Sequence, residues 1–261
     1  MNPKVVFFGG PDYGKSTIIG RMIAEVHNIN MENVEKKLRE EMGANYLPDY
    51  LYSSFVNPHQ AESLRRGERA NSKQHEIKNI KIDDTAPIVL IDTPGHDKYI
   101  SGRQLGMSMS DIGVYCLAIE KVLDDDFGGI VFTKYSDLFS EYHPNGKLIY
   151  LLTMFDVMDY GESYYLTACE KIKEKCRWVE INHVEEAFGV PIEVDYNDID
   201  AAAIIPVAVE FKTKEKEGIN IFSRNEKTSW YSGLTLIEAI RIQIGAMEMD
   251  AILSAQDNGY V

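Results

Sequence analysis

The sequence predicts an α/β fold in which a mostly parallel, doubly wound sheet is flanked by helices. Short apolar runs, typical of buried strands, recur along the chain, and stretches with apolar residues at helical spacing separate them. Parallel strands need such crossover helices, and no internal repeat interrupts the alternation. We therefore expect one domain over residues 1–261, with its ligand at the carboxyl ends of the strands.

The chain begins with its two clearest elements. Val5–Gly9 is an apolar run that ends in glycine, and Ser16–Val26 has apolar residues at helical spacing. Met31–Met42 predicts a second helix, rich in charge. Residues 43–74 show little regular patterning, and a long irregular segment inside a compact domain is usually functional.

Two strands are expected next. His75–Ile82 alternates, which is typical of an edge strand, whereas Ile88–Ile91 is a continuous apolar run, typical of a central strand. The remaining expectations, in chain order, are a helix at Tyr99–Ser110, a strand at Gly113–Ile119, a loop at Asp124–Gly129, a helix at Phe132–Tyr142, a strand at Lys147–Met154, helices at Ser163–Val179 and Val184–Phe188, a strand at Ala202–Val209, a polar loop at Lys212–Gly233 and a closing helix at Leu234–Leu253.

Composition and charge restrict the function. The chain is 44% hydrophobic and 26% charged, as in an ordinary globular protein. No run approaches the ~20 apolar residues of a membrane-spanning helix, and no basic segment precedes the first apolar run, so we expect neither a membrane partner nor a signal peptide. The net charge of −14 excludes non-specific nucleic-acid binding but leaves a specific RNA contact open. Three cysteines without metal or redox spacing favour a cytoplasmic location.

A glycine-rich segment between the first strand and the first helix has the chemistry of a phosphate cradle. Residues 9–16 read GGPDYGKS and fit G-x-x-x-x-G-K-[ST] in the strand–loop–helix context that the motif requires. Lys15 would reach the β- and γ-phosphates of a nucleotide, and the Ser16 hydroxyl would ligate Mg²⁺. A chance glycine-rich turn is the disfavoured alternative. The other expected nucleotide-binding positions are Gly10, Asp12, Tyr13, Gly14 and Thr17.

A second candidate anchor follows the apolar run at Ile88–Ile91. The residues from Asp92 to His96 read DTPGH. The Asp92 carboxylate can hold Mg²⁺, usually through water, and the Gly95 N–H can meet a γ-phosphate. A simple Pro-Gly turn is the alternative, which the position after a second parallel strand disfavours.

These motifs resemble those of the GTPase domain of translation factors, nearest to elongation factor Tu and elongation factor 1-alpha. Residues 8–17, FGGPDYGKST, are similar to the family loop G-H-V-D-H-G-K-[ST], with Asp12 kept and Tyr13 in place of histidine. Ile91–His96 is similar to the family motif [ID]-x-P-G-H, and residues 230–239, WYSGLTLIEA, to the closing segment W-Y-x-G-x-T-L-[IL]-E-A. The resemblance covers nearly the whole chain, weakest from 31 to 84, and implies a P-loop NTPase of the Ras-like G-domain type.

The resemblance assigns catalysis and base recognition. His96 matches the family histidine that positions the attacking water, with Lys15 on the phosphates; a surface or capping histidine is the alternative. Asp156 matches the aspartate of N-K-x-D, and its carboxylate can accept two hydrogen bonds from guanine that adenine does not offer. If Asp156 only caps the following helix, an ATPase stays open. Met154 can pack on the purine, and the backbone N–H of Ala208 matches the family donor to guanine O6.

The sequence departs from the family pattern in residues 43–74, which correspond to its first switch. The threonine that completes the Mg²⁺ shell becomes Arg69 in one alignment and Ser72 in another; we prefer Ser72, which can ligate a cation. The apolar gate in front of His96 changes to Pro11 with Glu68 or Asn71. The family's two β-barrel domains do not follow the closing helix, so delivery of aminoacyl-tRNA is not expected.

Three functions follow from these observations. The leading hypothesis is a stand-alone GTPase that binds GTP or GDP with Mg²⁺, hydrolyses GTP slowly and responds to a protein activator or effector. The second is a degenerate G domain that binds guanine nucleotide with little turnover. The third, a protein that has lost nucleotide binding, is disfavoured by the intact Lys15-Ser16 pair.

Overall fold

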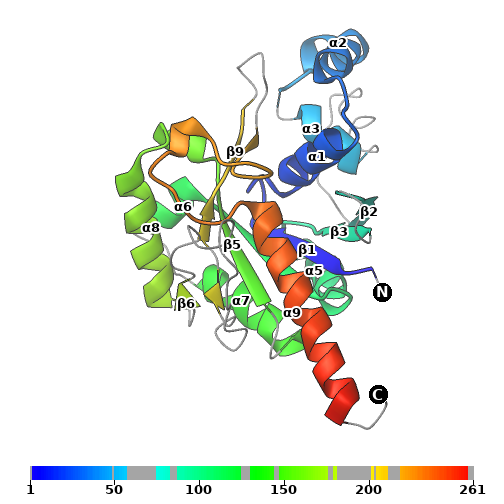
Figure 1. Cartoon of the computed structure of the whole chain (residues 1–261). Coiled ribbons are helices and arrows are strands. Elements are labelled where there is room, and N and C mark those ends of the chain that lie inside the picture. Colours follow the sequence, from blue (N-terminus) through cyan, green and yellow to red (C-terminus); the bar gives the residue numbers. More distant parts are fainter. Residues whose placement is uncertain are drawn as a thin grey trace.

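A central sheet organises the computed structural model, which describes residues 2–48, 50–57, 75–82, 87–124, 130–143, 147–175, 179–180, 201–202, 204–210 and 218–257 (Figure 1). The sheet has six strands in the order β2-β3-β1-β4-β5-β8. Its pairings are parallel except for the edge pair β2–β3. In the order of the chain, these strands are β1 (Lys4–Gly9), β2 (Glu76–Ile80), β3 (Ile88–Asp92), β4 (Ile112–Ala118), β5 (Lys147–Thr153) and β8 (Ile204–Pro206).

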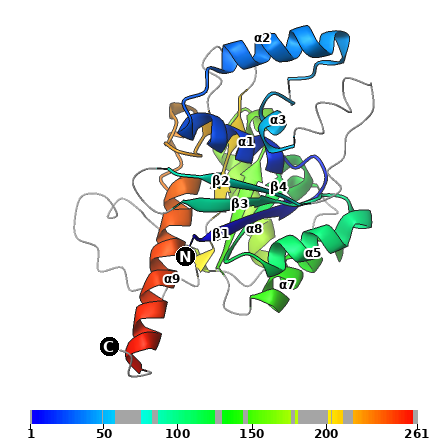
Figure 2. The same ribbon diagram turned by 90° about the vertical axis from the view of Figure 1, so that its right-hand side faces the viewer.

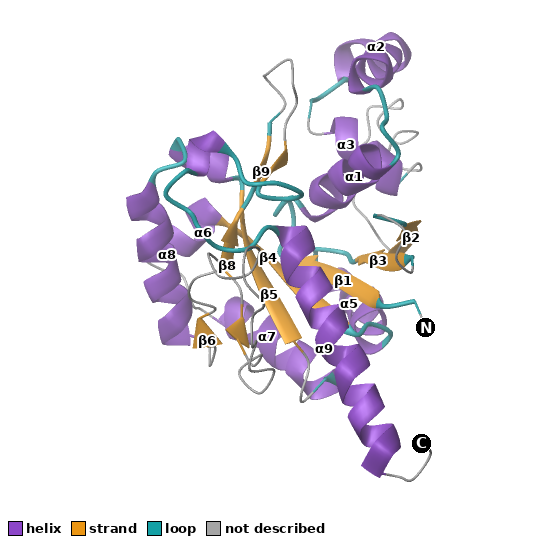
Figure 3. Ribbon diagram, in the orientation of Figure 1, coloured by secondary structure: helices purple, strands orange, loops and turns teal. Residues whose placement is uncertain are grey.

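Helices cover both faces of this sheet, as Figures 2 and 3 show. One face carries α1 (Lys15–Val26), α3 (Tyr50–Val56) and α9 (Leu236–Asp257). The helix α2 (Met31–Met42) adds buried side chains to the same core. The other face carries α5 (Ile100–Ser108), α6 (Ile119–Leu123), α7 (Ile130–Tyr142) and α8 (Glu162–Lys175). The predicted α/β class with a mostly parallel sheet is therefore confirmed.

The first strand explains why its sequence is apolar without interruption. Successive side chains of a strand point to opposite faces of the sheet. Val5 and Phe7 belong to the core under α1 and α9, whereas Val6 and Phe8 belong to the core under α5 and α7. All four side chains are fully buried. A strand covered on both faces needs apolar residues at every position.

Several predicted elements need correction. The segment at 43–74, expected to be irregular, contains a short 3-10 helix (Gly43–Asn45) and α3. The α3 backbone packs directly on Gly20 of α1, where a Cβ atom would come within 1.9 Å of the Tyr52 carbonyl oxygen. Burial against α1 thus imposes a helix that the local pattern does not indicate. Residues 58–74 lie outside the described part of the chain.

The expected strand at Ala202–Val209 is also wrong as a single element. The structure divides this segment between β7 (Ala201–Ala202), β8 and β9 (Ala208–Val209). The β7 strand pairs with β6 (Val179–Glu180), β8 joins the main sheet, and β9 pairs with β10 (Gly218–Ile219). One apolar run therefore serves three sheets, which periodicity alone does not reveal.

The other corrections are changes of boundary. Ile119, expected in a strand, begins α6, and α8 ends before Val179, which lies in β6. The expected polar loop at Lys212–Gly233 contains β10 and a 3-10 helix at Glu226–Thr228. The expected helix at Val184–Phe188 and most of the expected loop at Asp124–Gly129 lie outside the described residues. Across the part of the chain that the structure describes, no helix is long and apolar enough to span a membrane.

Candidate functional site

Three loops meet at the carboxyl ends of β1, β3 and β5. Strand β1 lies between β3 and β4, and the strand order reverses at this point of the sheet. In doubly wound sheets the crevice beside such a reversal is the usual ligand site. Residues 9–15 lead from the end of β1 into α1, Asp92 ends β3 before residues 93–96, and Thr153 ends β5 before residues 154–156. The candidate phosphate, metal and base residues thus come from one edge of the sheet.

The loop after β1 adopts a conformation that its glycines permit. Gly9 has a φ of 142° and Gly14 a φ of 77°, both in the region that glycine occupies readily. A Cβ atom at Gly9 would lie 2.2 Å from the Cys116 carbonyl oxygen of β4, so no larger residue fits there. Asp12 also has a positive φ, of 59°. The Tyr13 ring folds back over Gly10 and is half-buried.

Lys15 is buried in this loop at the first position of α1. Its Nζ donates to the carbonyl oxygens of Gly9, at 3.3 Å, and Gly10, at 2.6 Å. Burial lowers the pKa of the Lys15 ammonium, and the neighbouring Asp92 carboxylate opposes that change. A buried ammonium is costly unless paired, so an anion placed at this loop would be strongly attracted to it.

The hydroxyl of Ser16 and the carboxylate of Asp92 lie in direct contact. Ser16 Oγ donates to Asp92 Oδ2 at 2.5 Å, while Asp92 Oδ1 is buried and has no hydrogen-bond partner among the described residues. Burial raises the pKa of Asp92 to about 6, although Lys15 and Ser16 favour its charged form. An orphaned carboxylate oxygen beside a hydroxyl is a donor set that suits Mg²⁺.

This donor set is small. Within the described ranges, no group of three or more His, Cys, Asp or Glu side chains gathers where a metal ion could bind. A cation at Ser16 and Asp92 would therefore need further oxygen ligands from water or from a bound phosphate, which is how Mg²⁺ is usually held beside nucleotides.

The loop after β3 is pressed against the loop after β1. Thr93 binds the Phe7 carbonyl oxygen twice, through its N–H at 3.2 Å and its hydroxyl at 2.8 Å. A Cβ atom at Gly95 would lie within 2.7 Å of the backbone of Gly10 and Pro11. His96 is half-buried and immediately precedes the 3-10 helix Asp97–Tyr99. Only glycine at position 95 lets the two loops come this close, so Gly95, directly before His96, contacts the phosphate loop.

The loop after β5 is built differently. Met154 has a positive φ of 58° and is the N-cap of the 3-10 helix Phe155–Met158, and Asp156 lies exposed inside that helix. Because α8 begins only at Glu162, Asp156 is not at the N-cap of either helix. The alternative that Asp156 caps the following helix is therefore not supported.

Backbone hydrogen bonds join the β5 loop to the loop after β8. The Val207 N–H donates to the Leu152 carbonyl oxygen at 2.8 Å, and the Phe155 N–H donates to the Val207 carbonyl oxygen at 3.2 Å. Ala208 follows in β9, opposite Ile219. The Asn220 amide donates to the Pro206 carbonyl oxygen at 2.9 Å and holds this corner. Asp156 and Ala208 are thus brought to neighbouring loops.

Comparison with known proteins agrees with this arrangement. Residues 2–126 match the family model described as the elongation factor Tu GTP binding domain. The chain is 28% identical over 237 residues to elongation factor 1-alpha of Thermococcus onnurineus, covering 90% of this chain and 46% of the relative. It is 27% identical over 232 residues to elongation factor 1-alpha of Halobacterium salinarum, covering 89% and 47%. Over these residues the chain is similar to the GTP-binding domain of translation factors. It spans about half the length of these curated relatives.

Solved structures share the fold. The Saccharomyces cerevisiae Ski7 GTPase-like domain bound to GTP superposes with a TM-score of 0.62 at 17% identity, over 95% of this chain and 50% of that chain. The same domain bound to GDP and inorganic phosphate superposes with a TM-score of 0.60 at 16% identity, over 92% and 48%. The architecture described above is therefore that of a G domain.

The structure of the G domain brings together most of the predicted site residues. The loop after β1 and the start of α1 hold Gly10, Asp12, Tyr13, Gly14, Lys15, Ser16 and Thr17, while Asp92, Gly95 and His96 follow β3, Asp156 follows β5 and Ala208 follows β8. The remaining predicted residue, Ser72, lies outside the described part of the chain. Its role as a metal ligand stays a prediction.

Two buried polar residues at the site were missed from sequence. The Thr153 hydroxyl is buried and has no hydrogen-bond partner among the residues that the structure describes, and a Cβ atom at Gly14 would lie 3.8 Å from the Thr153 Cβ. Arg103 is fully buried beneath the loop after β3. A lone arginine in the otherwise uncharged stretch Ile100–Ser108 is the signal that could have found it.

Proposed function

We propose that this G domain binds GTP and GDP with Mg²⁺ and hydrolyses GTP slowly to GDP and phosphate. One observation carries the proposal: Lys15 and Ser16 at the start of α1 are gathered with Asp92 at the end of β3, and a buried ammonium there lies beside a buried carboxylate. Lys15 is buried against two carbonyl oxygens, and Asp92 Oδ1 has no partner in the described part of the chain. A triphosphate and a divalent cation would satisfy both.

Binding would exchange weak contacts for strong ones. The Lys15 ammonium would leave the Gly9 and Gly10 carbonyl oxygens for the β- and γ-phosphates, since a charge-assisted hydrogen bond is roughly twice as strong as a neutral one. Ser16 and Asp92 would hold Mg²⁺, which supplies neutralisation of the phosphate charge when bound. The backbone N–H groups at the start of α1 would add the positive end of a helix.

Guanine selection is assigned to Asp156, with the Ala208 N–H as a donor to guanine O6. The exposed carboxylate of Asp156 lies at the position of the family aspartate, and α8 begins too late for it to serve as a cap. The curated relatives are elongation factors, and the structural neighbours are titled as bound to GTP or GDP. Both support a guanine nucleotide as the ligand.

Hydrolysis is assigned to His96, which would orient the attacking water. Switch GTPases position water and stabilise charge, and without a partner they turn over at about 10⁻⁴ to 10⁻² s⁻¹. We therefore propose slow intrinsic turnover and a protein partner that accelerates it or reads the bound nucleotide.

Binding with little turnover is the second candidate. Pro11 matches the sequence position of one apolar gate residue of the family, and its backbone packs against Gly95, directly before His96. A gate of altered composition in front of His96 is the reason to keep binding without efficient turnover as an alternative.

The proposal is tested by calorimetric titration of the purified chain with GTP, GDP and ATP, first with Mg²⁺ and then with a chelator. We expect GTP and GDP to bind, ATP to bind at least tenfold more weakly, and the chelator to weaken GTP most. Binding of ATP equal to that of GTP would reject guanine selection. Single-turnover hydrolysis of bound GTP then separates slow turnover from binding alone.

A further inference from the structure

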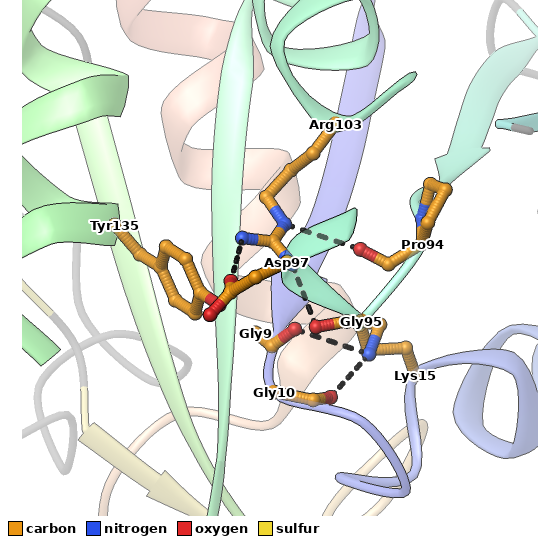
Figure 4. A network of polar contacts seen from close by, with 8 residues as sticks. All are labelled: Gly9, Gly10, Lys15, Pro94, Gly95, Asp97, Arg103 and Tyr135. Atoms are coloured by element: carbon orange, nitrogen blue, oxygen red, sulfur yellow. Dashed lines mark hydrogen bonds and ion pairs between the residues drawn. The ribbon is translucent and has the colours of Figure 1, made fainter. Parts of the chain in front are cut away.

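A buried arginine lies directly under the loop that carries Gly95 and His96. Arg103 of α5 is fully buried, and all three nitrogens of its guanidinium are engaged (Figure 4). Its Nε donates to the Pro94 carbonyl oxygen at 3.1 Å, and its Nη2 donates to the Gly95 carbonyl oxygen at 2.6 Å. Its Nη1 reaches the Asp97 carboxylate at 3.4 Å. A planar fork of donors suits such a set of fixed acceptors.

A second residue supports the arginine from α7. The Arg103 guanidinium lies over the Tyr135 ring, 4.0 Å from its centroid, and the Tyr135 hydroxyl donates to Asp97 at 2.5 Å. Burial and this hydrogen bond raise the pKa of Tyr135 to about 12, so the hydroxyl keeps its proton near neutral pH. The Arg103 clamp, made of Arg103, Tyr135 and Asp97, thus fixes the loop by its carbonyl groups.

The geometry of the peptide bond also fixes which N–H groups face the opposite side of the loop. In a trans peptide the N–H points away from the preceding C=O. Because the Pro94 carbonyl faces Arg103, the Gly95 N–H faces away from it. Likewise, the His96 N–H faces away from the Gly95 carbonyl that Arg103 holds.

The opposite side is the phosphate loop. Gly95 packs against the backbone of Gly10 and Pro11, and Figure 4 shows Gly95 between the guanidinium and the residues Gly10 and Lys15. The loop is therefore held from two sides, by Arg103 beneath it and by the phosphate loop above it. The direction of the Gly95 N–H is therefore set by contacts within the protein itself.

We propose that Arg103 is a positioning residue that presets the Gly95 N–H for a γ-phosphate and thereby makes the domain favour GTP over GDP. The inference rests on the proposed function, since it concerns the same nucleotide site. GDP lacks the group that the Gly95 N–H would meet, so loss of the clamp should weaken the binding of GTP and spare that of GDP.

The test compares the affinities of a β,γ-imido analogue of GTP and of GDP in the wild-type chain and in variants. Arg103→Met keeps the length and apolar stem of the side chain but removes every donor. We expect the analogue to bind about tenfold more weakly, because the hydrogen bond from the Gly95 N–H to the charged γ-phosphate would be lost. The affinity for GDP, which lacks that phosphate, should change by less than about twofold. Asp97→Ala, at a side chain that is 60% exposed, should shift the ratio in the same direction by a smaller factor without threatening the fold.

Arg39→Met is the matched control. Arg39 also pairs with a carboxylate, Glu35, and stacks on a tyrosine ring, Tyr46, at 4.4 Å, but it lies on α2. Its substitution should leave both affinities unchanged. Amide hydrogen exchange over residues 93–99 in the nucleotide-free chain should rise in Arg103→Met and stay unchanged in Arg39→Met.

The outcomes separate the two proposals. If the wild-type chain binds neither nucleotide, the proposed function fails, and the role of Arg103 in nucleotide selection fails with it. If the wild-type chain binds both and Arg103→Met keeps their ratio, or weakens both equally, the proposed function stands and only the positioning role is overturned.

Discussion

The phosphate side and the base side of the candidate site are built in opposite ways. On the phosphate side, charged groups are buried and bonded: Lys15 and Asp92 are 6% and 2% exposed, and Arg103 is fully buried. On the base side, backbone hydrogen bonds hold the loops, and the residue assigned to the base, Asp156, is exposed. Compared with the family pattern, the phosphate side keeps Lys15 and Ser16 and changes at Pro11 and Tyr13. The base side keeps Asp156 and changes the first two residues of N-K-x-D to Thr153 and Met154.

This difference has a physical cause. A buried ion is costly unless its surroundings compensate it, so each buried charge on the phosphate side restricts its neighbours. The Asp156 carboxylate is exposed, so its charge carries a smaller desolvation cost than the buried charges of the phosphate side. We therefore expect substitutions on the phosphate side to have larger effects than substitutions on the base side.

The largest expected effect is that of Lys15→Ala on the phosphate side. Removal of the ammonium deletes two charge-assisted contacts to phosphate, so GTP affinity should fall about 100-fold or more. Calorimetry measures it, with Lys36→Ala, at an exposed lysine of α2, as the control. A loss of less than about threefold would show that the loop does not bind phosphate.

His96→Ala tests the same side through the rate. Without the group that orients water, single-turnover hydrolysis should slow by about 100-fold, whereas affinity for the β,γ-imido analogue should stay within about twofold. Rates equal to those of the wild type would instead indicate a G domain in which His96 has no part in turnover.

Asp156→Ala tests the base side. Loss of the carboxylate removes two acceptors for guanine, so the preference for GTP over ATP should fall about tenfold. The competition of ATP with a fluorescent GTP analogue measures this ratio. An unchanged ratio would mean that another group reads the base, and the buried Thr153 hydroxyl would be the next residue to substitute.

Met154→Ala is expected to have the smallest effect. Its side chain would cover part of the purine face, so its truncation should weaken GTP and ATP equally, by about threefold. The same competition assay detects it. An effect on GTP alone would contradict simple packing and would place Met154 in base selection with Asp156.

Local patterns in the sequence were sufficient for much of the fold. The strand β1, the helix α1 and the strand β3 lie within a residue or two of their expected bounds, because each is an apolar run or a helical repeat complete in itself. The glycine-rich loop was predictable for a similar reason, since its conformation depends on its own glycines. The division of Ala202–Val209 among three sheets was not, because strands with different partners share one apolar pattern.

By itself the sequence determined the α/β class and the glycine-rich loop between the first strand and the first helix, since these depend on residue type and on spacing within short segments. The residues that would meet a nucleotide stay predictions of the same kind. Only the tertiary structure decided how the loops support one another. Asp97 and Arg103 lie in adjoining elements of the chain, whereas Tyr135 comes from α7, and no local pattern connects it with them. Packing of α5 and α7 on one face of the sheet brings them under Gly95, where a buried guanidinium must find acceptors, and the carbonyl groups of that loop are the acceptors it finds.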